Sequence, residues 1–335
     1  MFFVLSGFLI TGILLAHKDS PVYFRAFYAH RALRIFPIYF LLLFAVLVVA
    51  PIVSPGFATD WGSGTWVYVL FLSNMRLLSD VGVISLTTIQ VLAPTWSLAV
   101  EEQFYIGWSV VVRCLPIGAL AILATVTITV GIALRCILLR DTEWAMPQYV
   151  SRVFFFTFTH LDGLCTGILI RLAFGHPAYK NKLIVLARSW WAWAVLVALI
   201  ITVDHAMAPQ YVNSYGPLMM RVGLTVIATF AGAIVVHGLL IDGWVRRLFE
   251  LAWLKRLGDY SYCMYLYHWP IAALLLWAFP NWQEALDPWV AFALQLGAVI
   301  GFAAISRRWI EAPFLRMKAA ISYDRRGLPA GNNPA

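Results

Sequence analysis

Long apolar runs recur along almost the whole of this 335-residue chain and limit it more than any other feature. An α-helix needs about 20 predominantly apolar residues to cross a hydrocarbon core about 30 Å thick. Hydrophobic residues make up 62% of the chain and charged residues 12%, against roughly 25% charged in ordinary soluble domains. We therefore expect an all-α, polytopic transmembrane helix bundle of about nine spans. The predicted spans are residues 1–16, 35–54, 96–113, 117–139, 153–171, 189–206, 216–241, 260–279 and 289–306.

The net charge of +8 does not indicate a nucleic-acid-binding protein, because Lys and Arg gather in short loops between the apolar runs. Four such basic segments, 18–34, 171–188, 246–256 and 307–318, are expected on the cytoplasmic side. The connections near Asp204 and at 284–287 carry neither Lys nor Arg and are expected outside. This orientation predicts a multi-pass protein of the bacterial inner membrane with a cytoplasmic C-terminus.

One apolar stretch, about 63–79, does not fit as a span. Counting spans from the basic segments on either side places both residues 55–62 and the segment before Trp96 outside. Both counts agree only if 63–79 enters and leaves on the same side. We predict a re-entrant or surface-lying segment there, which requires cover from protein or a wet cavity.

The first span also lacks a polar or basic flank before FFVLSGFLITGILLA at 2–16, which a signal peptide would carry. With the 18–34 segment inside, this span runs inward, which favours a preceding helix, although a natural start at Met1 stays open. Residues 1–318 are predicted to be one membrane domain, and 319–335 a disordered cytoplasmic tail. The cysteines, which form no CxxC pair, are interpreted as packing residues, and no metal site is predicted.

Two acids near the start of a predicted span need a reason to be there. Glu101 and Glu102 lie in WSLAVEEQFYIGWSVVV, and a carboxylate facing lipid costs at least a few kcal/mol. Helical spacing puts Glu101 on one face with Ser97, Tyr105 and Trp108. Either acid can instead form an ion pair that holds helices together; the alternative is a polar cavity.

A second unusual stretch is GDYSYCMYLYHWPI at 258–271, in which Ser261, Tyr265 and His268 share a helical stripe. Pro270 cannot donate to the Leu266 carbonyl and is expected to bend the helix there. His268 is either a hydrogen-bonding packing residue or part of a site.

His160 and Asp162 also lie within a predicted span, about 200° apart on a helix. Asp162 is expected to pair with an arginine, and His160 to bond a polar group across the bundle.

At the inner face, HRALRIFPIY carries Arg31 and Arg34 at i, i+3 immediately before a span, with Pro37 near its first turn. Two guanidinium groups on one face can grip phosphates in a fixed fork geometry. Plain positive-inside anchoring is the alternative. Arg25, Tyr28 and His30 nearby would complete a pocket for a polyanionic ligand.

Together these motifs resemble the acyltransferase-3 family of bacterial integral membrane O-acyltransferases. The resemblance runs over nearly the whole chain, and five motifs occur in order. They are FFVLSGFLIT at 2–11, RALRIFPIY at 31–39, TWSLAVEEQFY at 95–105, SYCMYLYHWPI at 261–271 and IEAP at 310–313.

The resemblance implies a ten-helix bundle that moves acyl groups from cytoplasmic acyl-CoA to envelope sugars. Family members carry an Arg and a His about ten residues apart in a helix before the LSGF motif, and that His is their general base. Nothing in this sequence precedes Met1, so the chain as it stands is expected to bind poorly or to be inactive. His160 stands where the family commonly has Arg before a Leu-Asp pair.

We therefore predict a membrane O-acyltransferase that moves an acyl group, acetyl by expectation, onto a hydroxyl of an envelope glycan. Glu101, Tyr105 and His268 are the catalytic candidates, and Arg31 and Arg34 would bind CoA phosphates. Acyl-CoA is a donor substrate, and no tightly bound cofactor is expected. A catalytically inactive relic and a transporter-like membrane protein are the alternatives. The further residues assigned to the substrate cavity are Glu102, His160 and Tyr265.

Overall fold

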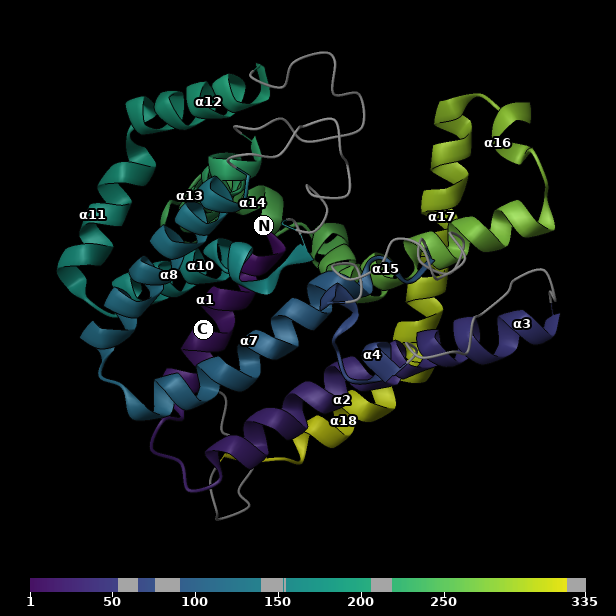
Figure 1. The fold of residues 1–335 in the computed structure, drawn as a ribbon, viewed down its shortest axis with the longest axis horizontal. Coiled ribbons are helices and arrows are strands. Elements are labelled where there is room, and N and C mark those ends of the chain that lie inside the picture. The colour runs from purple at the N-terminus through teal and green to yellow at the C-terminus, as the bar shows by residue number, and fades with distance from the viewer. Residues whose placement is uncertain (54–65, 76–90, 140–152, 154, 206–218, 324–335) are drawn as a thin grey trace. The chain divides into compact units, whose positions relative to one another are not determined.

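The computed structural model describes residues 1–53, 66–75, 91–139, 153, 155–205 and 219–323, and every regular element within these ranges is a helix. Each of the nine predicted spans overlaps one of these helices (Figure 1). The longer helices are α1 (Phe2–Ala16), α2 (Tyr23–Phe44), α7 (Thr95–Cys114), α8 (Ile117–Leu138), α10 (Asp162–Phe174), α11 (Pro177–Arg188), α12 (Trp190–His205), α13 (Leu224–Leu240), α15 (Ala252–Ala278), α17 (Pro288–Ser306) and α18 (Ala312–Ala319). The short elements are η1 (Ala45–Val49), α3 (Ala50–Val53), α4 (Trp66–Val69), η2 (Thr157–Thr159), η3 (Met219–Gly223), α14 (Trp244–Phe249), α16 (Trp282–Ala285) and η4 (Arg307–Glu311).

Four helical stretches of the described chain are long and apolar enough to cross a membrane, which makes this a multi-pass membrane protein. They are Tyr23–Val53, Ile117–Leu138, Met219–Leu240 and Pro288–Ala319. A fifth is added if Pro177–Arg188 and Trp191–Thr202, bent by 69° at their junction, count as one broken span. The number nine stays a prediction.

Two predicted spans differ in extent from the helices of the structure, because hydropathy marks apolar stretches and not helix ends. α2 begins at Tyr23, so the basic segment with Arg31 and Arg34 is itself helical and Pro37 lies in the helix interior. The predicted span at 153–171 is interrupted, because Val153 and Phe155 are helical, the 3₁₀ turn of η2 follows, and α10 begins at Asp162. The acid in that first helical turn is favourable because the exposed N–H groups there carry partial positive charge. His160 and Asp162 therefore do not share one continuous helix.

The stretch at 63–79 is described only in part. Its described residues form the four-residue helix α4, a turn in which Phe71 has a φ of 55°, and a further helical segment at 73–75. The Tyr39 hydroxyl donates to the carbonyl of Tyr68 over 2.6 Å, which attaches this segment to α2. Its position relative to the membrane stays a prediction.

The helices pack into two compact groups. The first group is Met1–Lys18, Asn74–Val81 and Ala99–Leu251, and the second is Asp19–Ser73, Gly82–Leu98 and Ala252–Ala335. α7 begins in the second group and continues in the first. The prediction of one domain over 1–318 and a tail at 319–335 stays a prediction, and residues 324–335 lie outside the described ranges.

Within the first group, α1 and α10 cross at backbone distance (Figure 1). A Cβ added at Gly7 would lie 2.0 Å from the Leu164 carbonyl oxygen, and one at Gly167 would lie 2.1 Å from that of Val4. Small residues allow such close approach between helices in membranes, where burial of apolar surface gives little driving force. The glycine of the LSGF motif is therefore a packing residue.

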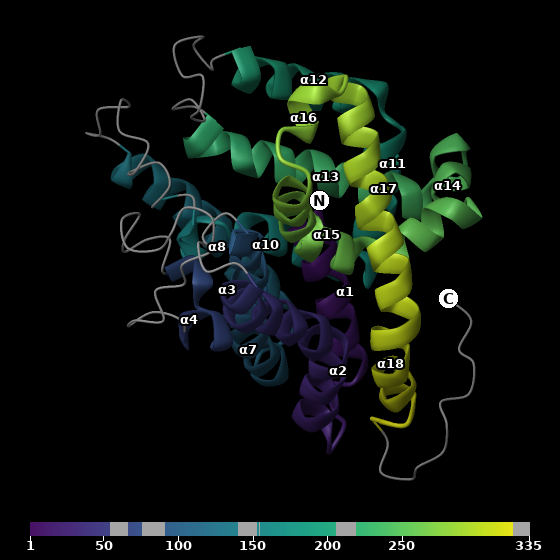
Figure 2. The same ribbon diagram turned by 90° about the vertical axis from the view of Figure 1, so that its right-hand side faces the viewer.

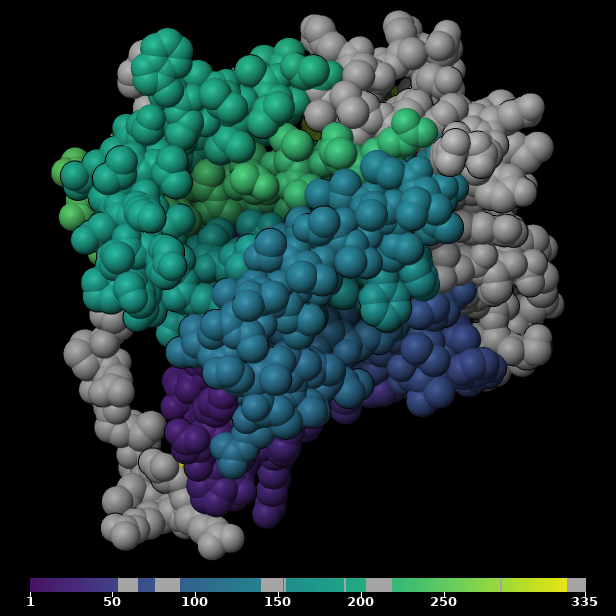
Figure 3. Space-filling model, turned by 60° about the vertical axis from the view of Figure 1, so that its left-hand side comes forward, coloured from purple at the N-terminus to yellow at the C-terminus, as the bar shows by residue number. Residues whose placement is uncertain are grey.

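On the outside of the same group, α8 lies at the surface, drawn in blue in Figure 3. Ile122, Val126 and Val130 are exposed at intervals of four residues and so form one apolar stripe. An exposed apolar stripe on a span is the face that contacts lipid.

Within the second group, two tyrosines of α15 donate to backbone carbonyls of α2. The Tyr262 hydroxyl bonds to Ile35 over 3.0 Å, and that of Tyr267 bonds to Ile38 over 3.2 Å. α17, η4 and α18 form one long helical stretch, in yellow in Figure 2, so the last predicted span continues well past residue 306. α18 packs beside the N-terminal half of α2.

Candidate functional site

The predicted face of α7 exists and is buried. Glu101 is 2% exposed, and Tyr105, Trp108 and Ser97 are also buried, while Glu102 is partly exposed. The Trp108 indole donates to the Thr11 hydroxyl over 2.9 Å, which connects α7 to α1 in the first group. The position of Glu101 therefore agrees with an acid turned away from lipid.

Close to these acids, three polar side chains bond to one another in a ring. Gln103 donates from its amide to Asn74 over 2.8 Å, Asn74 donates to the Thr157 hydroxyl over 2.9 Å, and Thr157 donates back to Gln103 over 2.7 Å. Asn74 is also 3.2 Å from the Phe155 carbonyl, to which it donates. Every group in this ring has a partner, so it positions α7 against the η2 turn.

A buried ion pair lies behind the same turn. Arg135 of α8 is 0% exposed and Asp162 is 5% exposed, with 3.1 Å between guanidinium nitrogen and carboxylate oxygen. Arg135 also donates to the carbonyls of Thr159 and Arg221 and to the Thr225 hydroxyl, which itself donates to Asp162 over 2.7 Å. The expectation that Asp162 pairs with an arginine is confirmed.

His160 belongs to this cluster, buried with its ring edge-on to Phe3 at 5.7 Å between centroids. The charges of both Asp162 and Arg135 act on it. A hydrogen bond from His160 across the bundle stays a prediction.

Sequence reasoning did not single out Arg135, Arg221 or the ring residue Gln103. For the two arginines a signal was present, because each is a charged residue inside an apolar run, at 117–139 and 216–241.

In the second group, Tyr265 bonds to Ser97 through its hydroxyl and to His268 through its main-chain carbonyl. The hydroxyls of Ser97 and Tyr265 share a hydrogen bond of 2.6 Å. The His268 Nδ1 donates to the Tyr265 carbonyl over 2.5 Å, and the two rings lie 5.8 Å apart. This bond places the proton of a neutral ring on Nδ1 and the lone pair on Nε2. His268 can therefore accept a proton at Nε2.

The basic pair on α2 is joined by residues that were not predicted as part of the site. The positive charges of Arg31 and Arg34 act on Lys318 of α18. That of Arg34 also acts on the buried Glu311 of the IEAP motif. Glu311 also accepts from Arg307 over 3.3 Å and from Ser306 over 3.5 Å. Lys318 and Arg307 thus add two cations to the predicted pair, beside one acid.

The segment after α18 is held at the same end of α2. His30 donates to the Ile321 carbonyl over 2.9 Å, and Ser20 donates to the Tyr323 carbonyl over 2.6 Å. Burial raises the pKa of Tyr323 to about 12, while the charge of Arg31 acts in the opposite direction. Tyr323 is thus a neutral hydrogen-bonding group beside the basic cluster.

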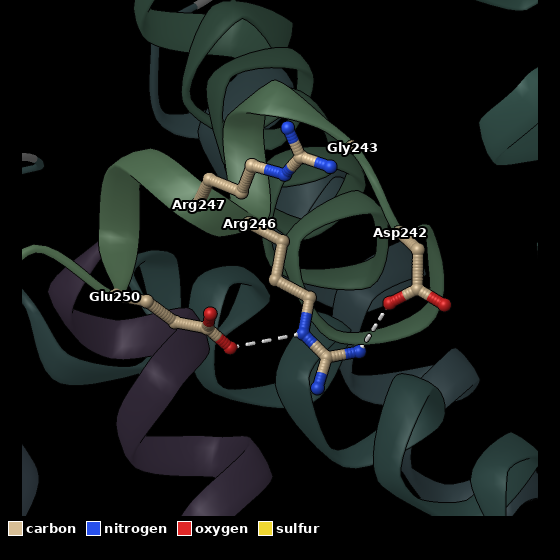
Figure 4. Close-up of a pocket in the computed structure, with 5 residues that line it drawn as sticks. All are labelled: Asp242, Gly243, Arg246, Arg247 and Glu250. Atoms are coloured by element: carbon tan, nitrogen blue, oxygen red, sulfur yellow. Dashed lines mark hydrogen bonds and ion pairs between the residues drawn. The ribbon is translucent and has the colours of Figure 1, made fainter.

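A separate charged pocket of about 410 Å³ lies at α14 (Figure 4). Arg246 is bonded to Asp242 over 2.6 Å and to Glu250 over 3.1 Å, and Arg247 points away from both acids in Figure 4. The carboxylates raise the pKa of Arg246. These exposed i, i+4 pairs contribute little to stability and suit anchoring at the membrane surface.

The predicted site residues thus fall in both groups of helices. Glu101, Glu102, Tyr105 and His160 belong to the first, and Arg31, Arg34, Tyr265 and His268 to the second. A multi-pass helical bundle that buries an acid and a charged pair among its helices defines a membrane protein with polar groups in its interior.

The particular family follows from comparison with known proteins: residues 1–308 match the family model described as an acyltransferase domain. The chain belongs to this acyltransferase-3 family. It is similar to peptidoglycan O-acetyltransferase OatA of Listeria monocytogenes, at 27% identity over 96% of this chain and 51% of that protein. A protein of Bacillus subtilis named putative peptidoglycan O-acetyltransferase YrhL is 27% identical over 97% of this chain and 51% of its own length.

A putative O-acetyltransferase of Staphylococcus aureus is 25% identical over 93% of this chain and 51% of its own length. The chain therefore spans about half the length of the curated relatives it matches. No solved structure matches it.

Proposed function

We propose that this protein transfers an acyl group, acetyl in the simplest case, from cytoplasmic acyl-CoA to a hydroxyl of an envelope carbohydrate. Family membership and the names of the relatives support the reaction class and the glycan acceptor. The bacterial inner membrane and a cytoplasmic C-terminus belong to the same proposal. The observation that carries it is the burial of Glu101 on one face with Tyr105, inside a membrane bundle.

The reaction exchanges one acyl bond for another. The sugar oxygen attacks the thioester carbon, the C–O bond forms, the C–S bond breaks, and CoA leaves as its thiol. The hydroxyl proton must pass to a base, and negative charge on the carbonyl oxygen must be stabilised by a donor. In this proposal the Glu101 carboxylate takes the hydroxyl proton and passes it on to the departing CoA thiolate, and the Tyr105 hydroxyl is the donor to the carbonyl oxygen.

The donor binds through its phosphates at the basic cluster. Arg31 and Arg34 lie one helical turn apart, and Lys318 adds a third cation. Guanidinium groups bind phosphate with two parallel hydrogen bonds, which fixes orientation as well as charge. Glu311, beside Arg34, holds this arginine in place through its charge.

The test uses membranes from cells that express the natural gene, supplied with acetyl-CoA labelled in the acetyl group. We expect label in the glycan fraction and a fall of about 10²-fold or more for Glu101→Gln, the size of a general acid–base contribution. Glu250→Gln, which removes an exposed carboxylate on the surface, is the matched control. Thermal unfolding in detergent checks that both variants fold.

Unlabelled glycan with the natural protein would favour the relic or the transporter-like alternative. A folded Glu101→Gln variant that transfers at the natural rate would remove Glu101 from the mechanism.

A further inference from the structure

The second group of helices contains an apolar cavity of about 490 Å³ that the reaction has not yet used. It lies between the C-terminal half of α2 with η1 and α3, the middle of α15, and α17. The residues that line it include Ala45, Val49, Tyr267, Ile271, Ala273 and Phe302.

The lining offers a ligand almost no polar atom. Among the described residues that line it, Tyr267 alone bears a hydroxyl, and that hydroxyl donates to the Ile38 carbonyl of α2. The wall on the α2 side includes the π-helical turn of η1, at Ala45 to Val49. Such turns inside α-helices are frequent at functional sites. The cavity therefore suits a hydrocarbon chain and not a sugar.

The same helix joins this cavity to the basic cluster. Arg34 of α2 and Ala45, where η1 continues that helix, are 11 residues apart, which at about 1.5 Å rise per residue is about 16 Å along the axis. A ligand with an anionic head at Arg34 and an apolar end at Ala45 would thus lie along α2. α15 lines the cavity with Tyr267 and Pro270, on either side of His268 in the sequence.

We propose that the cavity receives the hydrocarbon chain of the acyl donor, so that the protein binds acyl-CoA with a chain of several carbons more tightly than acetyl-CoA. This inference rests on the proposed function and names its donor class. An apolar cavity of about 150 Å³ already holds benzene. The cavity beside α2 therefore has room for far more than the single methyl of an acetyl group.

The test measures equilibrium binding of CoA, acetyl-CoA and octanoyl-CoA to the detergent-solubilised full-length protein. Transfer from water gives about fourfold in affinity per fully buried methylene. Allowing for partial burial and competition from detergent, we expect octanoyl-CoA to bind at least tenfold tighter than acetyl-CoA.

Two variants fill the cavity from opposite walls, Ala45→Trp on η1 and Ala273→Trp on α15. Each is expected to abolish the advantage of octanoyl-CoA and leave acetyl-CoA binding within about twofold. Ala293→Trp, at an exposed position of α17 outside the cavity, is the matched control and keeps the advantage.

Equal affinity for all three ligands would overturn the inference, as would an undiminished octanoyl advantage in both cavity variants. Octanoyl lysophosphatidylglycerol is the competitor that represents membrane lipid. If it displaces octanoyl-CoA at the same concentration, the occupant is a lipid and the inference fails.

A different measurement tests the proposed donor site, namely the dependence of CoA binding on Arg34. If CoA binds equally well to the natural protein and to Arg34→Gln, the donor site is misplaced whatever the chain length does. If CoA binding depends on Arg34 while chain length has no effect, only the cavity assignment is lost.

Discussion

Arg135 and Asp162 form an ion pair with both side chains buried, at 3.1 Å between nitrogen and oxygen, in a part of the chain that the sequence marks as apolar. Arg135 has hydrogen-bond acceptors for Nε and both Nη atoms. Because every donor nitrogen is satisfied, the pair serves to fix α8, the η2 turn and η3 relative to one another rather than to bind a ligand.

The first prediction concerns this pair. Arg135→Met leaves the Asp162 carboxylate buried without its cation, which costs about 3–5 kcal/mol. We expect a clearly lower unfolding temperature in detergent, and recovery of much of the loss in the double variant with Asp162→Leu. Arg246→Met, which removes an exposed ion pair, is the control and should not shift unfolding. Equal shifts of the unfolding temperature in Arg135→Met and Arg246→Met would contradict a structural role for the buried ion pair.

The second prediction concerns the crossing of α1 and α10. Gly167→Ala places a methyl 2.1 Å from the Val4 carbonyl oxygen, so the helices must separate. We expect a loss of about 1–3 kcal/mol, the usual cost of overpacking. Gly107→Ala is the control, because nothing lies within 4 Å of its added Cβ. It should be neutral or stabilising by up to about 1 kcal/mol through helix propensity. Thermal unfolding in one detergent compares the two.

The third prediction concerns the ring of Asn74, Gln103 and Thr157. Thr157→Val keeps the shape of the side chain but removes one hydrogen bond from the buried Asn74 amide and one from Gln103, which costs about 1–3 kcal/mol. Thr157→Ser should restore the natural stability. Thr125→Val is the control, since that exposed hydroxyl bonds only within its own helix. If Thr157→Val and Thr125→Val unfold alike, the ring does not hold α7.

The fourth prediction concerns the donor phosphates. Arg34→Gln removes a charged donor, worth about 1.5–3 kcal/mol in a hydrogen bond, so KM for acyl-CoA should rise about tenfold or more while kcat changes little. Arg247→Gln removes an equal charge from a different surface and should leave KM unchanged. Steady-state transfer kinetics with the natural gene product separate the two. A fall in kcat alone would place Arg34 in the chemical step instead.

The fifth prediction concerns the topology. α15 has 27 residues, about 40 Å, which is enough to cross the membrane. Cysteines introduced at Lys255 and Asn281, with Cys114 and Cys136 replaced by serine, should react with a membrane-impermeant reagent from inside and outside respectively. Labelling of both from one side would contradict the predicted orientation.

Some features of the fold could be predicted because their physics is local. The apolar run at 117–139 is long enough to identify α8, and the i, i+4 spacing of Glu101 and Tyr105 is enough to put them on one face. The pairing of Asp162 with an arginine could be expected because an isolated charge is costly in a bundle. Its partner, Arg135, could not be chosen, since that depends on which helices pack together.

Other features depend on tertiary contacts that no local pattern encodes. Helix α2 begins a dozen residues before the apolar run because its amphipathic start packs on α18, so hydropathy placed Pro37 wrongly. Lys318 joins Arg31 and Arg34 from nearly 290 residues away for the same reason. The ring through Gln103 also closes over long sequence distances. Polar contacts between distant segments remain the part that sequence reasoning alone does not reach.

The crossing at Gly7 and Gly167 brings main chain against main chain, so no choice of rotamer at neighbouring positions can compensate for a larger residue there. A relative that keeps the α1–α10 crossing is expected to carry the smallest side chain at both points. The presence of glycine at both positions in a diverged homologue therefore indicates that the homologue keeps the α1–α10 crossing.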